Sequence, residues 1–184
     1  MAQVKLWEHL GDSPVLQTPV FEVLRRRCRS PKDGLEKNFS CLAAPDWVNV
    51  LPLTDDGRAV LVRQYRHGSR RLSLELPGGV VEPGQSPEET ARRELMEETG
   101  WSAADFRLLC SLNPNPALFG NAIHTFVARG ARPAGATCFD ENEDLELELV
   151  PEERLADLIT EGLIDHALMV AAIGRHLLDG RRPA

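Results

Sequence analysis

The residues from Leu76 to Trp101 constrain the fold of this chain more than any other stretch. They open with a pair of adjacent glycines. Ser86 is predicted to cap a helix, because Pro87 suits the first helical position and Glu89 completes an S-x-x-E capping box. Gly100 is the residue type expected just past the end of a helix. We therefore predict a glycine-rich turn followed by a short, well-capped helix.

Three carboxylates are predicted to share one face of this helix. Glu94 and Glu97 are three residues apart and Glu94 and Glu98 are four apart, so all three lie within about one turn. Arg92 and Arg93 could neutralise part of this charge, which would make the face a solvated acidic surface. The glycine turn upstream would, however, hold backbone carbonyls beside the carboxylates. Oxygen ligands of this kind are those that Mg²⁺ and Mn²⁺ prefer, so we favour a metal site.

The spacing of this stretch resembles the Nudix box, G-x5-E-x7-R-E-U-x-E-E-x-G-U, in which U is a bulky apolar residue. The positions in register are Gly79, Arg93, Glu94, Leu95, Glu97, Glu98, Gly100 and Trp101. The one departure is Gln85, where the family has a glutamate that acts mainly as a structural partner, often of the box arginine. A glutamine keeps the hydrogen bonding and loses the charge. The box is therefore still expected to bind metal, with Arg93 held more loosely.

Composition limits the partners of such a site. The chain has 184 residues and a formal net charge of −7, with 42% hydrophobic and 27% charged residues. This negative balance argues against broad binding to nucleic acid or to anionic membranes, which need a basic surface. It does not exclude an anionic small substrate, because bound metal ions reverse the local potential.

Cysteine spacing and hydropathy bear on the compartment. The four cysteines are widely spaced and form no C-x-x-C pair, which favours free thiols in a reducing compartment. The first residues contain no apolar signal core, and no apolar run reaches transmembrane length. We therefore predict a cytoplasmic protein without nucleic-acid or membrane partners.

Strands and helices are predicted in an order that fits an α+β protein. Residues 1–18 are weakly patterned, and the helical pattern lies at 87–99 and in the last third, at 151–162 and 165–178. Strand patterns occur at 20–28, 35–44, 47–54, 59–66, 72–76, 106–112, 122–128 and 145–150. Together with the box, this order implies the α/β/α sandwich with a mixed sheet that is typical of Nudix proteins. We divide the chain into an N-terminal strand region with a β-hairpin, 1–45, and a Nudix hydrolase domain, 46–184.

The arginine-rich run at 25–29 falls within the predicted hairpin. Such a run could bind nucleic acid, but the acidic total makes a charged, solubilising strand edge the better interpretation.

Outside the box, the chain is similar to the branch of the family that cleaves ADP-ribose and nucleotide sugars. The segments that carry this resemblance are V-R-Q-Y-R at 62–66, E-L-P-G-G at 75–79 and E-N-E-D at 141–144, with a proline at 116. The resemblance implies hydrolysis of a nucleoside diphosphate sugar, with ADP-ribose as first candidate, to a nucleoside monophosphate and a sugar phosphate. It also implies Mg²⁺, with Mn²⁺ possible, as cofactor.

The resemblance also assigns roles to the acidic residues. Glu94 and Glu98 are the implied metal ligands, with Glu97 close beside them, and the backbone carbonyl of Gly78 is a further ligand. The general base comes from the acidic loop after the box, where Glu141 matches the base and Glu143 a metal ligand in the substrate complex. These last two roles could be exchanged.

Three more residues are candidates for contact with the substrate. Arg66 matches the phosphate-binding arginine of the branch, and its planar fork suits a diphosphate. Glu75 could hydrogen-bond the substrate or buttress the glycine turn. Trp47 could stack on the base, although a tryptophan that opens a strand is more often part of the core. His124 has no sequence partner that suggests catalysis, and we treat it as a structural or surface residue.

The branch commonly exchanges its N-terminal strands between subunits, which implies a homodimer here. Two other interpretations stay open. The box could serve another substrate, such as GDP-mannose, a dinucleoside polyphosphate, coenzyme A or capped RNA. Alternatively, the chain could be a non-catalytic ADP-ribose-binding sensor, with Gln85 as a first sign of lost activity.

Overall fold

The computed structural model describes residues 3–139 and 144–180 of the chain. Two compact units are present. The first comprises Met1–Pro45 and Asn113–Ala122, and the second comprises Asp46–Leu112 and Ile123–Ala184.

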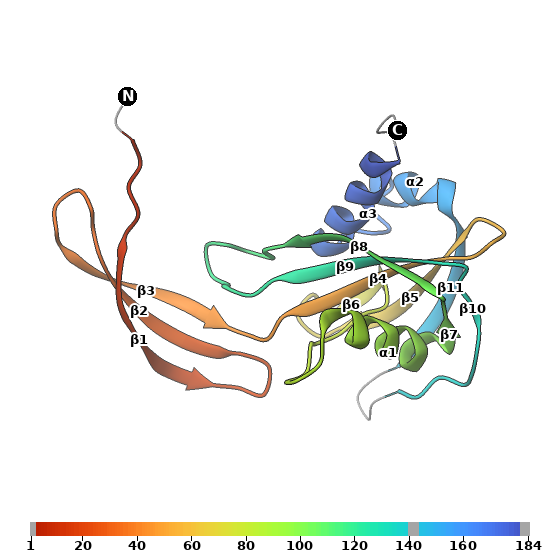
Figure 1. Cartoon of the computed structure of the whole chain (residues 1–184), viewed down its shortest axis with the longest axis horizontal. Coiled ribbons are helices and arrows are strands. Elements are labelled where there is room, and N and C mark those ends of the chain that lie inside the picture. The colour runs from red at the N-terminus through yellow and green to blue at the C-terminus, as the bar shows by residue number, and fades with distance from the viewer. Residues whose placement is uncertain (1–2, 140–143, 181–184) are drawn as a thin grey trace. The chain divides into compact units, whose positions relative to one another are not determined.

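The first unit is built on a three-stranded antiparallel sheet (Figure 1). Its strands, in spatial order, are β1 (Glu8–Gln17), β2 (Glu22–Arg29) and β3 (Glu36–Ala43). The β2–β3 hairpin confirms the prediction, whereas β1 lies in residues for which no strand was predicted. Its register shifts near Gly11 and again after Pro14, two residue types that interrupt regular strands. These irregularities explain why β1 shows no clear alternation.

The prediction that the arginine run forms a strand edge is wrong, because β2 is the central strand. Three of its arginines pair with acids on the neighbouring strands. Arg26 donates two hydrogen bonds to Asp12 on β1, at 2.9 and 2.8 Å. Arg29 pairs with Glu8 on β1 and with Glu36 on β3. The run is therefore a set of cross-strand ion pairs.

The proline-rich loop that contains Pro116 belongs to the same unit. The Leu42 N–H donates to the Leu118 carbonyl at 2.8 Å, and the Asn121 side chain donates to the Pro45 carbonyl at 2.7 Å. Both contacts attach the loop to the end of β3 and the residues that follow it.

The second unit is organised by a six-stranded mixed sheet with the order β11-β5-β4-β9-β8, in which β6 also pairs with β5. Strands β4 and β9 are parallel and the other pairs are antiparallel. A separate two-stranded ribbon joins β7 to β10. The strands are β4 (Trp47–Leu53), β5 (Arg58–Arg66), β6 (Arg71–Glu75), β7 (Trp101–Ser102), β8 (Asp105–Leu112), β9 (Ile123–Arg129), β10 (Arg132–Pro133) and β11 (Leu145–Pro151).

Helices cover both faces of this sheet (Figure 1). Along β4, Val48 and Val50 pack with the buried residues of α1 (Pro87–Thr99). Leu51 and Leu53 pack on the other face, in a cluster that includes α2 (Leu155–Thr160) and α3 (Ala167–Asp179). A short 3-10 helix, η1 (Glu152–Arg154), precedes α2. The predicted α/β/α sandwich with a mixed sheet is confirmed.

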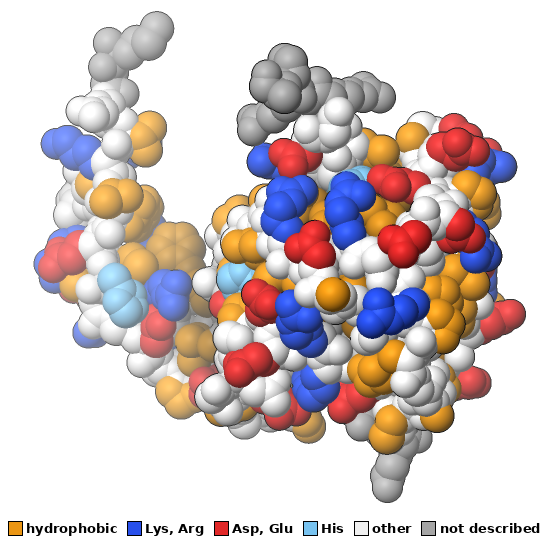
Figure 2. All heavy atoms as spheres, turned by 45° about the vertical axis from the view of Figure 1, so that its right-hand side comes forward, with side chains coloured by type: hydrophobic (Ala, Val, Ile, Leu, Met, Phe, Trp, Pro, Cys, Tyr) orange, Lys and Arg blue, Asp and Glu red, His pale blue; other side chains and the backbone are white. Residues whose placement is uncertain are grey.

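The predictions about the cysteines, membrane-spanning segments and surface charge can be compared with the structure. All four cysteines are free thiols. Within residues 3–139 and 144–180, no helix has the length and hydropathy needed to cross a membrane. Figure 2 shows Lys and Arg side chains interspersed with Asp and Glu over the visible face of the second unit.

Candidate metal and phosphate site

Helix α1 begins and ends as the sequence predicts. The N–H of Glu89 donates to the Ser86 hydroxyl at 3.2 Å, and the Ser86 N–H donates to the Glu89 carboxylate at 2.8 Å. Gly100 ends the helix with a φ of 69°, in the left-handed region that favours glycine. Because both ends are fixed, the glutamates of the helix have a defined position beside the sheet.

The glycine turn lies against β4, and contact distances require both of its glycines. The N–H groups of Val48 and Val50 donate to the carbonyls of Gly79 and Pro77, each at 2.9 Å. A Cβ on Gly78 would lie 2.1 Å from the Val48 carbonyl oxygen. A Cβ on Gly79 would lie 2.3 Å from the Glu94 carboxylate. The turn therefore leaves room for a carboxylate only because residue 79 has no side chain.

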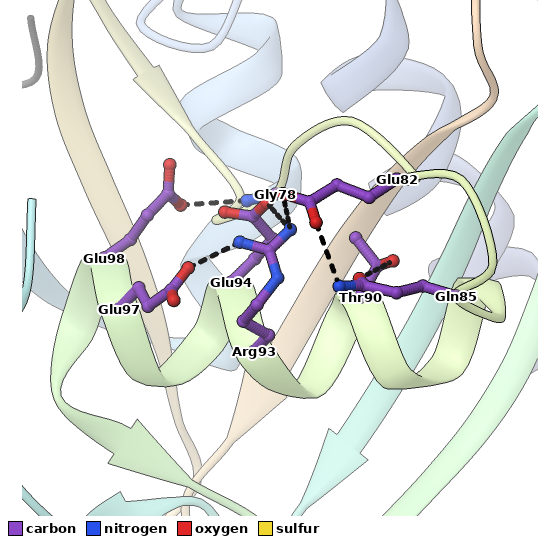
Figure 3. Close-up of polar contacts among 8 residues, drawn as sticks. All are labelled: Gly78, Glu82, Gln85, Thr90, Arg93, Glu94, Glu97 and Glu98. Carbon is purple, nitrogen blue, oxygen red and sulfur yellow. Dashed lines mark hydrogen bonds and ion pairs between the residues drawn. The ribbon is translucent and has the colours of Figure 1, made fainter. Parts of the chain in front are cut away.

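Two of the three predicted carboxylates are buried beside this turn (Figure 3). Glu94 and Glu98 expose only 9% and 4% of their surface. The Gly78 N–H donates to a Glu98 oxygen at 2.9 Å. Arg93 donates to Glu97 at 2.5 Å and to Glu94 at 2.8 Å. Burial lowers the pKa of Arg93, but the nearby carboxylates, Glu94 foremost, raise it above its ordinary value.

A pocket of about 310 Å³ opens over these groups. Of the residues predicted for the site, it is lined by Arg66, Gly78, Glu94, Glu97 and Glu98. The structure adds residues to the lining that the sequence did not single out, namely Gln64, Val80, Glu82 and Cys138. Strand alternation could have indicated Gln64, which lies two residues from Arg66 and so shares its face of β5.

The donor set fits part of a site for a hard divalent cation. Within the described ranges, no group of three or more His, Cys, Asp or Glu side chains forms a complete metal site. Mg²⁺ usually keeps several waters and binds through one or two carboxylates together with substrate phosphates. The buried pair Glu94 and Glu98 supplies such carboxylates beside the space that Gly79 leaves. Glu141 and Glu143, the predicted base and substrate-dependent ligand, lie outside the described residues.

The predicted phosphate-binding residue is held by a buried carboxylate. Arg66 donates to both oxygens of Glu75, at 2.9 and 2.7 Å. The side chain of Glu75 is completely buried, and His166 lies 3.1 Å from one of its oxygens. Burial raises the pKa of Glu75, but the hydrogen bonds from Arg66 and His166 outweigh it and lower the pKa well below its usual range. Glu75 is therefore paired with Arg66, a contact that the sequence did not predict.

Trp47 and His124 are both in the second unit but do not line the pocket. Trp47 is half-buried at the start of β4, bridges the backbone of Val80, and is absent from the described pocket lining. His124 on β9 lies 2.8 Å from the Ser111 hydroxyl on β8 and 3.0 Å from the Asp46 carboxylate. It links two neighbouring strands to the residue before β4, which agrees with a structural role.

Comparison with known proteins decides the family. A model of the NUDIX domain matches residues 45–172, which is most of the chain. The chain belongs to the Nudix family. A methanol dehydrogenase activator of Bacillus methanolicus is 33% identical over 129 residues, which cover 69% of this chain and 70% of the relative.

Two further similarities are to proteins whose names describe a hydrolytic activity. An ADP-ribose pyrophosphatase of Mycobacterium tuberculosis (strain ATCC 25618 / H37Rv) is 27% identical over 161 residues, covering 84% of this chain and 75% of the relative. The crystal structure of an ADP compounds hydrolase matches with a TM-score of 0.84 and 26% identity, covering 98% of each chain. The resemblance seen in the box is confirmed, as is the Nudix fold.

The unusual residue of this Nudix box has its own partners. The Gln85 amide donates to Glu82 at 3.1 Å and accepts a hydrogen bond from the Thr90 hydroxyl at 2.9 Å. The Arg93 guanidinium lies 3.9 Å from the other oxygen of Glu82. Arg93 nonetheless pairs closely with Glu94 and Glu97, so the loss of charge at 85 leaves the arginine paired.

Proposed function

We propose that this Nudix protein hydrolyses the diphosphate bond of ADP-ribose or a related nucleoside diphosphate sugar. The products would be a nucleoside monophosphate and a sugar phosphate. The observation that carries the proposal is that one pocket is lined both by the guanidinium-bearing Arg66 and by the buried carboxylates of Glu94 and Glu98. The names of the M. tuberculosis relative and of the matched crystal structure support the substrate class.

The proposed cofactor is Mg²⁺, with Mn²⁺ as an alternative. Glu94, Glu98 and the carbonyl of Gly78 would hold it. When bound, such an ion polarises the phosphoryl group and lowers the pKa of water. The pocket volume of about 310 Å³ is near the lower end for ligand pockets, roughly 300–1,000 Å³, and suits the diphosphate part of the substrate.

The chain's own residues would position and deprotonate the reactants. Arg66, which is paired with Glu75, would bind the diphosphate oxygens through its guanidinium. Arg93 would keep Glu94 and Glu97 in place through the ion pairs described above. We assign removal of the proton from the attacking water to Glu141, with Glu143 as a substrate-dependent ligand or in the exchanged role.

We also propose that the protein is a homodimer in which the N-terminal strands take part. The support comes from the first unit, where large apolar side chains remain exposed on all three strands or beside them, including Leu6, Leu16 and Phe39. Exposed apolar area of this kind is typical of an interaction surface.

The test of the activity is a product assay with Mg²⁺ and with Mn²⁺. The panel contains ADP-ribose, ADP-glucose, UDP-glucose, GDP-mannose, a diadenosine polyphosphate, coenzyme A and capped RNA. We expect AMP and a sugar phosphate from ADP-ribose, and Glu98→Gln should lower kcat by about 1,000-fold or more if Glu98 holds the metal. Turnover of only the diadenosine polyphosphate, coenzyme A or capped RNA would reject the substrate class. Tight binding of ADP-ribose without turnover would indicate the sensor interpretation.

A further inference from the structure

Glu82 lies between the unusual residue of the Nudix box and the box arginine (Figure 3). One of its carboxylate oxygens accepts a hydrogen bond from the Gln85 amide at 3.1 Å. Its other oxygen lies 3.9 Å from the guanidinium of Arg93. Glu82 also lines the pocket. A single carboxylate therefore connects position 85 to Arg93.

The hydrogen bonds at Gln85 depend on its being an amide. The buried Thr90 hydroxyl donates to the amide oxygen at 2.9 Å, which leaves the NH₂ group for Glu82. The reversed amide would place an oxygen against the Glu82 carboxylate. A glutamate at position 85 would do the same, because an ionised carboxylate only accepts hydrogen bonds. Glutamate at 82 and glutamine at 85 are thus a matched donor–acceptor pair.

The acidic partners of Arg93 come from its own helix and from the turn before that helix. Its two terminal nitrogens donate to Glu97 and Glu94, which come from the same helix α1. Its Nε is buried and has no hydrogen-bond partner among the described residues. Glu82 is the acid from the turn that faces the guanidinium. It is therefore placed to fix the side chain that orients Glu94 and Glu97.

We propose that Glu82 is a positioning residue for Arg93, and that Gln85 holds Glu82 in this role. The negative charge that the Nudix box carries at position 85 is supplied here from position 82. The catalytic consequence rests on the proposed function, whereas the placement of Arg93 does not. Glu82 is more than half exposed, so we expect a modest effect, as for other exposed ion pairs.

An exchange of the two residues tests this proposal. Glu82→Gln and Gln85→Glu should each lower kcat by about three- to fivefold, with KM for ADP-ribose changed by less than about twofold. The double variant Glu82→Gln/Gln85→Glu exchanges amide and carboxylate and should return kcat to within about twofold of the wild type. Restoration of this kind requires that the two side chains act together.

A second readout does not depend on turnover. The Nε–H signal of Arg93 in ¹⁵N NMR spectra of the metal-free protein should shift in both single variants and return in the double variant. The dissociation constant for Mn²⁺ should likewise change in both single variants and return to the wild-type value in the double variant. Glu88→Gln is the matched control, because it removes one exposed carboxylate from the first turn of α1, where Glu88 pairs with Arg92. This control should leave the Arg93 signal in place.

Three results would overturn the proposal. Gln85→Glu could raise both kcat and Mn²⁺ affinity, Glu82→Gln could behave like Glu88→Gln, or the losses of the single variants could simply add in the double variant. If the wild type hydrolyses no nucleotide sugar, the proposed function fails. The NMR signal and the Mn²⁺ affinity then still decide the role of Glu82.

Discussion

Gly78 and Gly79 differ in what an added methyl group would meet. Neither has a positive φ, so the constraint on both is steric. At Gly79 the methyl meets the end of the flexible Glu94 side chain, whereas at Gly78 it meets the backbone of Val48. The first glycine of the pair is therefore required by the fold and the second by the position of a carboxylate.

This difference predicts opposite effects of two alanine substitutions. Gly79→Ala should lower kcat by about 100-fold, because it displaces Glu94, and should leave the free energy of unfolding almost unchanged. Gly78→Ala should lower the free energy of unfolding by roughly 1–3 kcal/mol, because the backbone of β4 must move. Steady-state kinetics and urea unfolding on both variants measure this contrast. Wild-type kcat in Gly79→Ala would show that Glu94 can move without loss of activity.

Glu75 gives a prediction for the pH dependence of stability. Its folded pKa lies below the ordinary value of 4.5, so the ionised carboxylate contributes its full stability above that pH. This contribution is lost as the pH falls below about 4.5 toward the folded pKa. Glu75→Gln should lower the free energy of unfolding by about 3 kcal/mol at pH 7, and the difference from the wild type should shrink steadily in acid.

Urea unfolding at pH 7, 5, 4 and 3 measures this difference. Glu153→Gln, at an exposed position of η1, is the matched control and should show no such trend. A difference that stays constant from pH 7 to pH 3 would mean that Glu75 acts through its shape and not through its charge.

At the scale of the element, the helices and strands that could be predicted are those with a strong local sequence pattern. The two faces of β4 and the capping box of α1 produce regular signals, and the structure contains both elements. The register of strand β1 shifts twice and the ribbon β7–β10 pairs only two residues per strand, so neither segment shows a regular alternation in its sequence. The pairing of Glu75 with His166 also escaped prediction, because it joins residues from distant segments that meet only in the folded unit.

The capping box that fixes α1 can be tested by itself. Ser86→Ala removes the hydroxyl that accepts from the Glu89 N–H and should lower the free energy of unfolding by about 1 kcal/mol. Because the cap lies at the opposite end of the helix from Glu98, kcat measured on folded protein should change little. Ser69→Ala, at an exposed turn, is the control substitution in the same unfolding assay. Equal stability of both variants would show that packing alone holds the helix.

At the scale of the whole molecule, burial is distributed unevenly between the two units. Both apolar core clusters lie in the second unit. In the first unit, the buried residues among those described are Cys28, Ser30 and Asn121. A small sheet needs an apolar face packed on something to be stable. In the proposed dimer, the three strands would depend on packing against a second copy of the chain.

This dependence predicts the mass of the protein in solution. Light scattering coupled to size exclusion should give about twice the chain mass of 20.4 kDa over a micromolar concentration range. Val15 and Leu16 are exposed apolar residues of β1, so Val15→Asp and Leu16→Asp should each weaken a dimer in which this strand takes part. Leu163→Asp is the matched control, because Leu163 is an exposed leucine of the second unit, 54% exposed against 57% for Leu16. A monomeric wild type would reject the dimer, and dissociation by Leu163→Asp would place the interface on the second unit.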